Sequence, residues 1–70
     1  MKAKTYAVLV GNIGLIPAKN LIEARMIYGT YKRQSIEGVG RAAGEPVTIF
    51  EDGEPLPQYD YQPPQSDFEG

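Results

Sequence analysis

The 70-residue chain contains no cysteine, no histidine and no tryptophan. Without cysteine no disulfide can stabilise the fold, and without cysteine and histidine the usual zinc, haem and iron–sulfur sites are excluded. The same absences remove the side chain that most often transfers protons at neutral pH, and the commonest thiol nucleophile. We therefore expect a protein with no metal, no cofactor and no enzymatic activity.

Long apolar runs are also missing. The apolar stretch that follows Lys4 is interrupted by Gly11, Asn12 and Gly14, and it lacks a convincing cleavage site for a signal peptide. No stretch approaches the roughly eighteen apolar residues of a membrane helix. Because the lack of cysteine also fits a reducing compartment, we expect a cytoplasmic protein that does not enter a membrane.

What the chain does contain is enough apolar material for one small core. Hydrophobic residues make up 41% of the chain, and seven aromatic residues, five Tyr and two Phe, are among them. This composition is typical of a globular domain. Domains below about 80 residues rarely gain enough stability from one core, and commonly need disulfides, a metal or a partner subunit. With the first two excluded, we predict a homo-oligomer, most simply a dimer.

Charge is distributed unevenly along the chain. Residues 1–44 carry seven basic groups and two acids, a net charge of +5, whereas residues 45–70 carry seven acids and no base. Such a division is typical of a solvated acidic segment, or of a surface that meets a partner of opposite charge. The basic residues are scattered and the acidic half opposes a phosphate backbone, so we do not expect binding to nucleic acid.

The N-terminal region predicts a β-hairpin. Residues 5–10 alternate as a strand that is apolar on both faces. This predicts a central strand covered on both sides, or a strand covered by a helix on one side and by another subunit on the other. Turn residues at positions 11–14 lead into a short second strand at Leu15 and Ile16. Pro17, which has no N–H to donate, should end that pairing.

A helix is predicted after Asn20, which is a favourable N-cap. Glu23 stands where a capping box places its acid, and Gly38 is a natural C-cap. One face should pack on the sheet, because apolar and small residues recur there at helical spacing: Leu21, Ala24, Ile27, Tyr28, Tyr31 and Ser35.

The opposite face of this helix carries apolar residues where a solvent-exposed face is normally polar. The candidate interface residues are Ile22, Met26 and Arg33. Single exposed apolar residues are common, so chance is one interpretation. A dimer or partner interface is the other.

The C-terminal region predicts a second hairpin. Residues 46–51 form its first strand, Asp52-Gly53 is a strong two-residue turn signal, and residues 56–61 form the return arm. The expected fold is α+β, a hairpin–helix–hairpin chain with one helix packed on a small, mainly antiparallel sheet. We expect a single domain over residues 1–61 and a disordered, acidic, proline-containing tail over residues 62–70.

The glycine-rich connection after the helix is a candidate ligand site. Three glycines there allow backbone N–H groups to converge into a concave nest, and a guanidinium beside them could hold a phosphate through two parallel hydrogen bonds. The candidate ligand-binding residues are Gly38, Gly40, Arg41 and Gly44. The alternative is that the glycines only build the turn into the next strand, with Arg41 paired to Glu45 or Glu37.

Three stretches of the chain form a combined pattern. They are Gly11-Asn12-Ile13-Gly14, then Glu23-Ala24 with Tyr31 and Ser35, and then Gly38-x-Gly40-Arg41-Ala42-Ala43-Gly44-Glu45-x-Val47-Thr48-x-Phe50-x-Asp52-Gly53-Glu54. Together they resemble a group of small uncharacterised proteins encoded by phages and bacteria. The resemblance transfers no catalytic or binding residue. It implies a context in which small phage proteins bind and block a host or anti-phage defence component, or sequester its nucleotide signal.

Two functions are therefore expected from different classes. The first is a non-enzymatic phage or mobile-element accessory protein that inhibits a bacterial protein in the host cytoplasm by covering one of its surfaces. The alternative is a binding protein, or sponge, for a small anionic or nucleotide signalling ligand held by the Arg41 loop.

Overall fold

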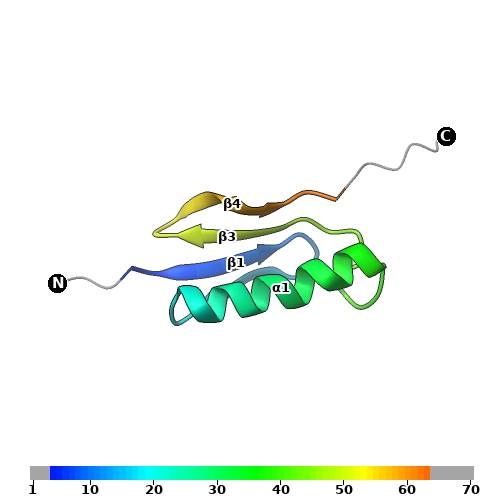
Figure 1. The fold of residues 1–70 in the computed structure, drawn as a ribbon, viewed down its shortest axis with the longest axis horizontal. Coiled ribbons are helices and arrows are strands. Elements are labelled where there is room, and N and C mark those ends of the chain that lie inside the picture. The colour runs from blue at the N-terminus through cyan, green and yellow to red at the C-terminus, as the bar shows by residue number, and fades with distance from the viewer. Residues whose placement is uncertain (1–3, 64–70) are drawn as a thin grey trace.

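Two hairpins and one helix build the protein, whose computed structural model describes residues 4–63. The elements are β1 (Tyr6–Val10), β2 (Gly14–Ala18), α1 (Leu21–Glu37), β3 (Val47–Glu51) and β4 (Glu54–Tyr61). All four strands pair antiparallel in one sheet of order β2-β1-β3-β4, and α1 lies along one face of it (Figure 1). The predicted α+β class, one helix on an antiparallel sheet in a single compact domain, is confirmed.

The ends of the chain lie outside the described residues. Residues 1–3 belong to the predicted domain, and residues 64–70 to the predicted acidic tail. The domain boundary at residue 61 and the disorder of the tail therefore stay predictions.

The first hairpin is longer than the sequence indicates. The prediction that Pro17 ends the pairing is wrong, because β2 continues to Ala18, with Pro17 opposite Ala7. β2 is an edge strand of the sheet. An edge strand tolerates proline where the missing N–H would point to solvent, so the pairing with β1 survives.

The predicted helix ends are confirmed by their caps. The Asn20 side chain accepts a hydrogen bond from the Glu23 N–H at 2.8 Å, and the Glu23 carboxylate accepts one from the Lys19 N–H at 2.6 Å. At the other end Gly38 has φ 70°, and its N–H donates to the Gln34 carbonyl. A left-handed residue at this position is characteristic of a glycine C-cap.

The second hairpin turns at Asp52-Gly53, as predicted. Both turn residues have positive φ, 53° and 85°, which is the requirement of a type I′ turn. Asp52 also holds the start of β1, because its N–H donates to the Thr5 carbonyl at 2.8 Å and its carboxylate accepts from the Thr5 N–H at 2.9 Å.

The core lies between α1 and the two central strands. Six hydrophobic residues have no exposed surface, four of them on β1 and β3: Val8, Val10, Ala24, Ala42, Val47 and Ile49. Partly buried residues extend this core, including Tyr28 and Tyr31 from the predicted helix face. The completely buried hydrophobic side chains among residues 4–63 are all alanine, valine or isoleucine, so the fold depends on a small buried volume.

One polar group in this core lacks a partner. Ser35 is 6% exposed, and its Oγ makes no hydrogen bond. A buried hydroxyl without a partner destabilises a protein because it loses its hydrogen bonds to water. We expect Ser35→Ala to raise the free energy of unfolding by about 1 kcal/mol, measured by chemical denaturation.

The matched control is Thr30→Ala on the same helix. The Thr30 hydroxyl is exposed and donates to the Met26 carbonyl at 3.0 Å, so its removal leaves no unsatisfied buried group. An equal gain in both variants would assign the effect to helix propensity instead of to the buried Ser35 hydroxyl.

Candidate interaction surfaces

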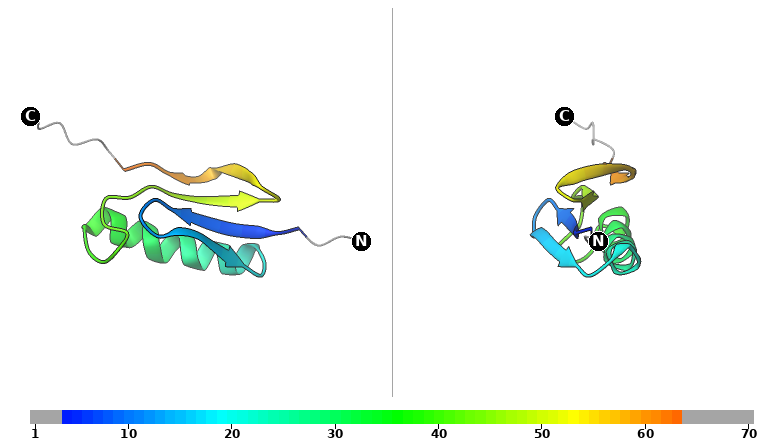
Figure 2. Two further views of the ribbon diagram at one scale, coloured as in Figure 1. Left: turned by 180° about the vertical axis from the view of Figure 1, so that it is seen from behind. Right: turned by 90° about the vertical axis from the view of Figure 1, so that its left-hand side faces the viewer.

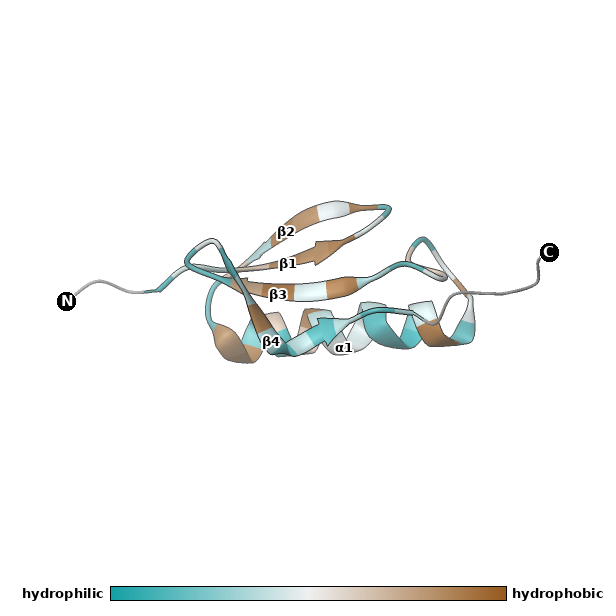
Figure 3. Cartoon of the chain, turned by 90° about the horizontal axis from the view of Figure 1, so that it is seen from above, coloured by the Kyte–Doolittle hydropathy of each residue, from teal (hydrophilic) through white to brown (hydrophobic). Residues whose placement is uncertain are grey.

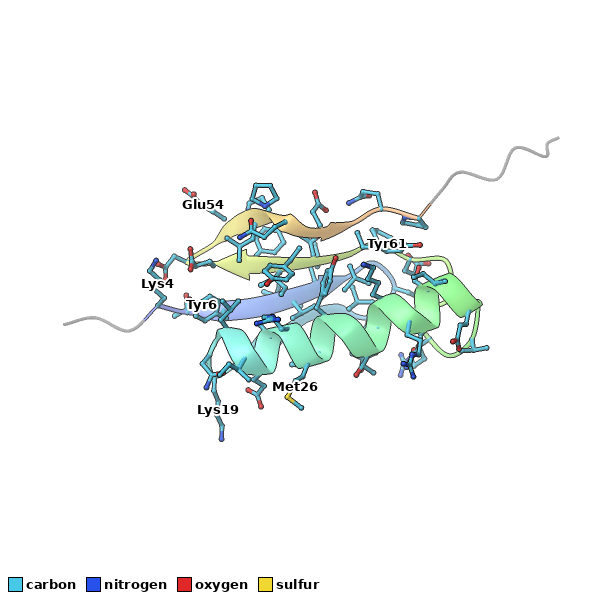
Figure 4. All side chains as sticks on the ribbon, viewed as in Figure 1. Lys4, Tyr6, Lys19, Met26, Glu54 and Tyr61 are labelled. Carbon is cyan, nitrogen blue, oxygen red and sulfur yellow. The ribbon has the colours of Figure 1, made fainter. Side chains whose placement is uncertain are left out.

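The outer face of α1 carries an exposed apolar stripe. Ile22 and Met26 are 69% and 67% exposed, and Met26 points away from the sheet (Figure 4). A shallow groove of about 530 Å³ lies beside these two residues, and Tyr31 forms part of its lining. The helical spacing correctly indicates that Ile22 and Met26 share the side of the helix opposite the core.

Arg33 joins this stripe through a depression at Gly29. Gly29 lies in a hollow of about 550 Å³ whose lining also includes Met26, Arg33 and Arg25. Val39, which is 51% exposed, lines the same depression. The structure therefore brings the predicted interface residues together on one surface, which we call the helix face: Ile22, Met26, Gly29, Arg33 and Arg25.

The glycine-rich loop is built as a connection between α1 and β3. Gly38, Gly40 and Gly44 all have φ near +70°, a conformation that glycine adopts without strain. Ala42 lies between Gly40 and Gly44 and is completely buried. A side chain added at Gly40 would also collide with Gln34, so the glycine pattern has a structural explanation.

Most backbone amides of this loop already have partners inside the chain. Five of them donate to protein oxygens, two to Gln34 and three to carbonyls around the turn: Val39, Ala42, Ala43, Gly44 and Glu45. An anion nest needs consecutive N–H groups that converge on the ligand. The loop therefore offers an external anion few of the donors that the ligand hypothesis requires.

Arg41 is exposed at the tip of the loop. Its carbonyl accepts a hydrogen bond from the Asn12 side chain at 3.2 Å, which ties the loop to the first hairpin. Among residues 4–63 the ion pair that forms is Lys4–Glu51, at 3.5 Å. The pairing of Arg41 with Glu45 or Glu37, which is part of the alternative interpretation of the loop, does not occur there. The guanidinium is left as the accessible charge of this loop.

The second face of the sheet, opposite α1, is apolar. Figure 2 shows the helix on one side only, and Figure 3 shows hydrophobic segments along β1, β2 and β3. The strand register places eight outward positions in two rows across β2, β1, β3 and β4, and the pairing of β3 with β4 is shifted by a bulge between the two rows. We call these eight residues the open sheet face: Pro17, Ala7, Phe50 and Pro55 in one row, and Leu15, Leu9, Thr48 and Asp60 in the other.

Sequence reasoning identified only the β1 part of this face. Residues 5–10 are predicted to be apolar on both sides, and Leu9 is 39% exposed as that prediction implies. Leu15, 62% exposed on β2, and Phe50 on β3 are not anticipated. Their alternation along each strand is visible in the sequence, but the register that aligns them with Ala7 and Leu9 comes from the sheet.

A cluster of aromatic and basic side chains connects α1 to β4. The Lys32 ammonium lies 5.6 Å from the ring centroids of both Tyr28 and Tyr61. The Arg25 guanidinium lies 5.9 Å from the ring of Tyr59, which meets Tyr28 edge-on at 5.5 Å. Such contacts stabilise by about 0.5–1 kcal/mol at exposed sites. Sequence reasoning missed this cluster, because it depends on which strand lies over the helix.

Two phenols in the protein hold their protons more tightly than usual. Burial raises the pKa of Tyr28 above its ordinary value of 10.0, and the charge of Asp60 raises it further. The Tyr6 hydroxyl donates to Glu51 Oε2 at 2.9 Å, and this hydrogen bond raises the pKa of Tyr6. In both cases the folded state favours the neutral phenol.

Comparisons with known proteins add no further assignment: no family model, no curated protein and no solved structure matches the chain. Within residues 4–63 no three acidic side chains gather as a metal would require. No helix in the same part of the chain is both long and apolar enough to cross a membrane.

The raised phenol pKa values predict a loss of stability at high pH. Each group stabilises the folded state fully below its unfolded pKa of about 10, and the contribution disappears as the pH rises through the folded pKa. We expect the free energy of unfolding to fall above about pH 10. Tyr28→Phe keeps the ring and should flatten that fall; an unchanged pH profile would contradict the assignment to Tyr28.

The loop geometry predicts that nucleotides do not bind through Arg41. In a thermal-shift panel of mono-, di- and cyclic nucleotides, we expect an unchanged melting temperature. A true ligand at 100 times its dissociation constant would add roughly 2.7 kcal/mol of stability. A shift that is present in the parent and absent in Arg41→Ala would establish the ligand hypothesis instead.

Proposed function

We propose that this protein is a non-enzymatic binding protein that docks on another protein through the helix face and blocks the surface it covers. The partner we propose is a bacterial host or anti-phage defence component, and the resemblance described in the sequence analysis is what supports this choice. The observation that carries the proposal is the exposure of Ile22 and Met26, 69% and 67%, beside two hollows on one side of α1.

The composition of the helix face indicates the chemistry of the partner. Two large apolar side chains at its centre offer the desolvated contact that dominates binding energy in protein interfaces. Arg25 and Arg33 line the adjoining depression together with the single acid Glu37. A partner surface with an apolar ridge flanked by carboxylates complements this arrangement, since rim charges steer and orient association.

The position of the helix face also suits a blocking role. α1 covers the sheet with its other side, so its outer surface is free to meet a partner along much of its length. The helix is anchored by caps at both ends. A rigid, prearranged helix loses little conformational freedom when it binds, which favours affinity.

Met26→Glu tests this function. The exchange places a charge at the centre of the helix face without touching the core, so we expect it to remove a stoichiometric partner that the tagged parent retains from bacterial lysate at low salt. In a phage challenge assay the same variant should lose the blocking effect. The loss of affinity should be at least roughly 30-fold, the effect of a hot-spot residue.

Leu15→Glu is the matched control. Leu15 is exposed to a similar extent, 62% against 67% for Met26, but lies on the open sheet face. Because its helix face is intact, Leu15→Glu should bind a single site of the partner with the affinity of the parent, and so should retain the partner. If the parent captures no stoichiometric protein at low salt, or if Leu15→Glu loses the partner while Met26→Glu keeps it, the helix face is not the docking surface.

A further inference from the structure

The open sheet face has the composition of a covered surface. An antiparallel sheet with one solvated face normally presents polar residues on that side. Here six of the eight outward positions are apolar, and the two polar residues bind each other, since the Thr48 hydroxyl donates to Asp60 Oδ1 at 2.9 Å. No basic side chain stands in either row. The helix covers the other face only, so a second cover is needed.

We infer that a second copy of this chain covers the open sheet face, in a twofold dimer with the two sheets packed face to face. The inference goes beyond the proposed function, because it concerns the opposite side of the molecule. The sheet edges do not offer an alternative route. Pro17 lies in the edge strand β2, and Pro55 and Pro57 lie in the edge strand β4, so backbone pairing with another strand is obstructed at both edges.

The shape of the open sheet face allows two copies of it to fit together. A hollow of about 400 Å³ lies on this side, and Ala7, Leu15 and Phe50 are among the residues that line it. Ala7 and Phe50 are direct neighbours in the register, on the two central strands. A twofold axis parallel to the strands, midway between β1 and β3, places β1 over β3 of the second copy. Each Ala7 then faces the partner's Phe50, so a small residue meets a large one twice.

The position of the charged residue Asp60 favours the same twofold axis, parallel to the strands. Asp60 is the single charged residue among the eight, and it lies on the edge strand β4. An axis parallel to the strands puts each Asp60 over β2 of the other copy, opposite the partner's Leu15, at two separate rims that remain in water. An axis perpendicular to the strands would instead stack β4 on β4 and place both carboxylates at the same rim, where they repel each other.

The size of the face sets the expected strength of association. Four strands at about 4.8 Å spacing, with about 3.4 Å per residue along each, give a face of about 19 by 17 Å. Two such faces total about 650 Å², which is less than a stable protein–protein interface buries and within the range of weak, transient contacts. We therefore expect a dissociation constant in the micromolar range, with concentration-dependent unfolding.

The dimer has a consequence for binding. Because the sheets meet at the centre, the two helix faces point outward on opposite sides, and each dimer presents two docking surfaces. Two linked sites raise the avidity for a multimeric partner beyond the affinity of one site. The dimer itself does not depend on that partner.

A residue exchange between Ala7 and Phe50 tests the geometry. We expect the parent to sediment with the mass of two chains at high micromolar concentration. In the Ala7→Phe dimer a large ring would face another large ring, and in the Phe50→Ala dimer a small residue would face another small residue. Each single variant should therefore raise the dissociation constant of the dimer at least roughly tenfold. The double variant restores a large residue facing a small one, and its dissociation constant should return towards that of the parent.

Two substitutions of opposite charge at the exposed Leu15 test the direction of the twofold axis. Leu15→Glu places a carboxylate opposite the partner's Asp60, whereas Leu15→Lys places an ammonium there. At low salt we expect Leu15→Lys to dimerise at least roughly tenfold more tightly than Leu15→Glu. Leu15 is 62% exposed, so both variants should fold, and circular dichroism checks this.

Met26→Glu separates this proposal from the proposed function. It should abolish partner binding and leave the mass at two chains. A single-chain mass for the parent across the micromolar range overturns the dimer. Dissociation by Met26→Glu, equal affinities of the two Leu15 variants, or a double variant no tighter than the weaker single variant would each overturn the face-to-face geometry.

Discussion

A single helix can cover only one face of a sheet, and this limit shapes the whole molecule. α1 packs against the central strands β1 and β3, where Val8, Val10, Val47 and Ile49 are completely buried. The sheet is four strands wide, so its other face and the outer side of the helix are left to water or to other molecules. Both of these surfaces are rich in apolar residues. The interactions proposed for the protein use these two apolar surfaces, which the single helix leaves uncovered.

Because the core is small, contacts around its edge contribute much of the stability of the fold. The chain has no cysteine, and the fully buried side chains are all of small or medium size. Around them, Tyr28, Tyr59 and Tyr61 pack with Arg25 and Lys32, and these long side chains bridge the distance between α1 and β4. These contacts also join the basic half of the chain to its acidic half, since Arg25 and Lys32 come from the first and Tyr59 and Tyr61 from the second.

The helix face and the open sheet face differ in composition, which suits them to different partners. The helix face combines exposed apolar side chains with guanidinium groups, a mixture suited to a partner of different composition. The open sheet face is nearly free of charge and pairs a small residue with a large one across its centre, which suits a second copy of itself. The glycine-rich loop belongs to neither surface, because its amides and the buried Ala42 serve the connection between α1 and β3.

The sequence by itself determined the local structure: Asn20 and Gly38 set the helix ends, and Asp52-Gly53 sets the second turn. These signals operate between residues a few positions apart, where backbone geometry decides. The sequence also determined that Ile22 and Met26 lie on the exposed side of α1, because the period of an α-helix is fixed. Only the tertiary structure decided that Pro17 remains paired, since strand position at an edge depends on the whole sheet. The alignment of Ala7 with Phe50, 43 residues later in the chain, was likewise decided there, because register between distant strands follows from packing against the helix.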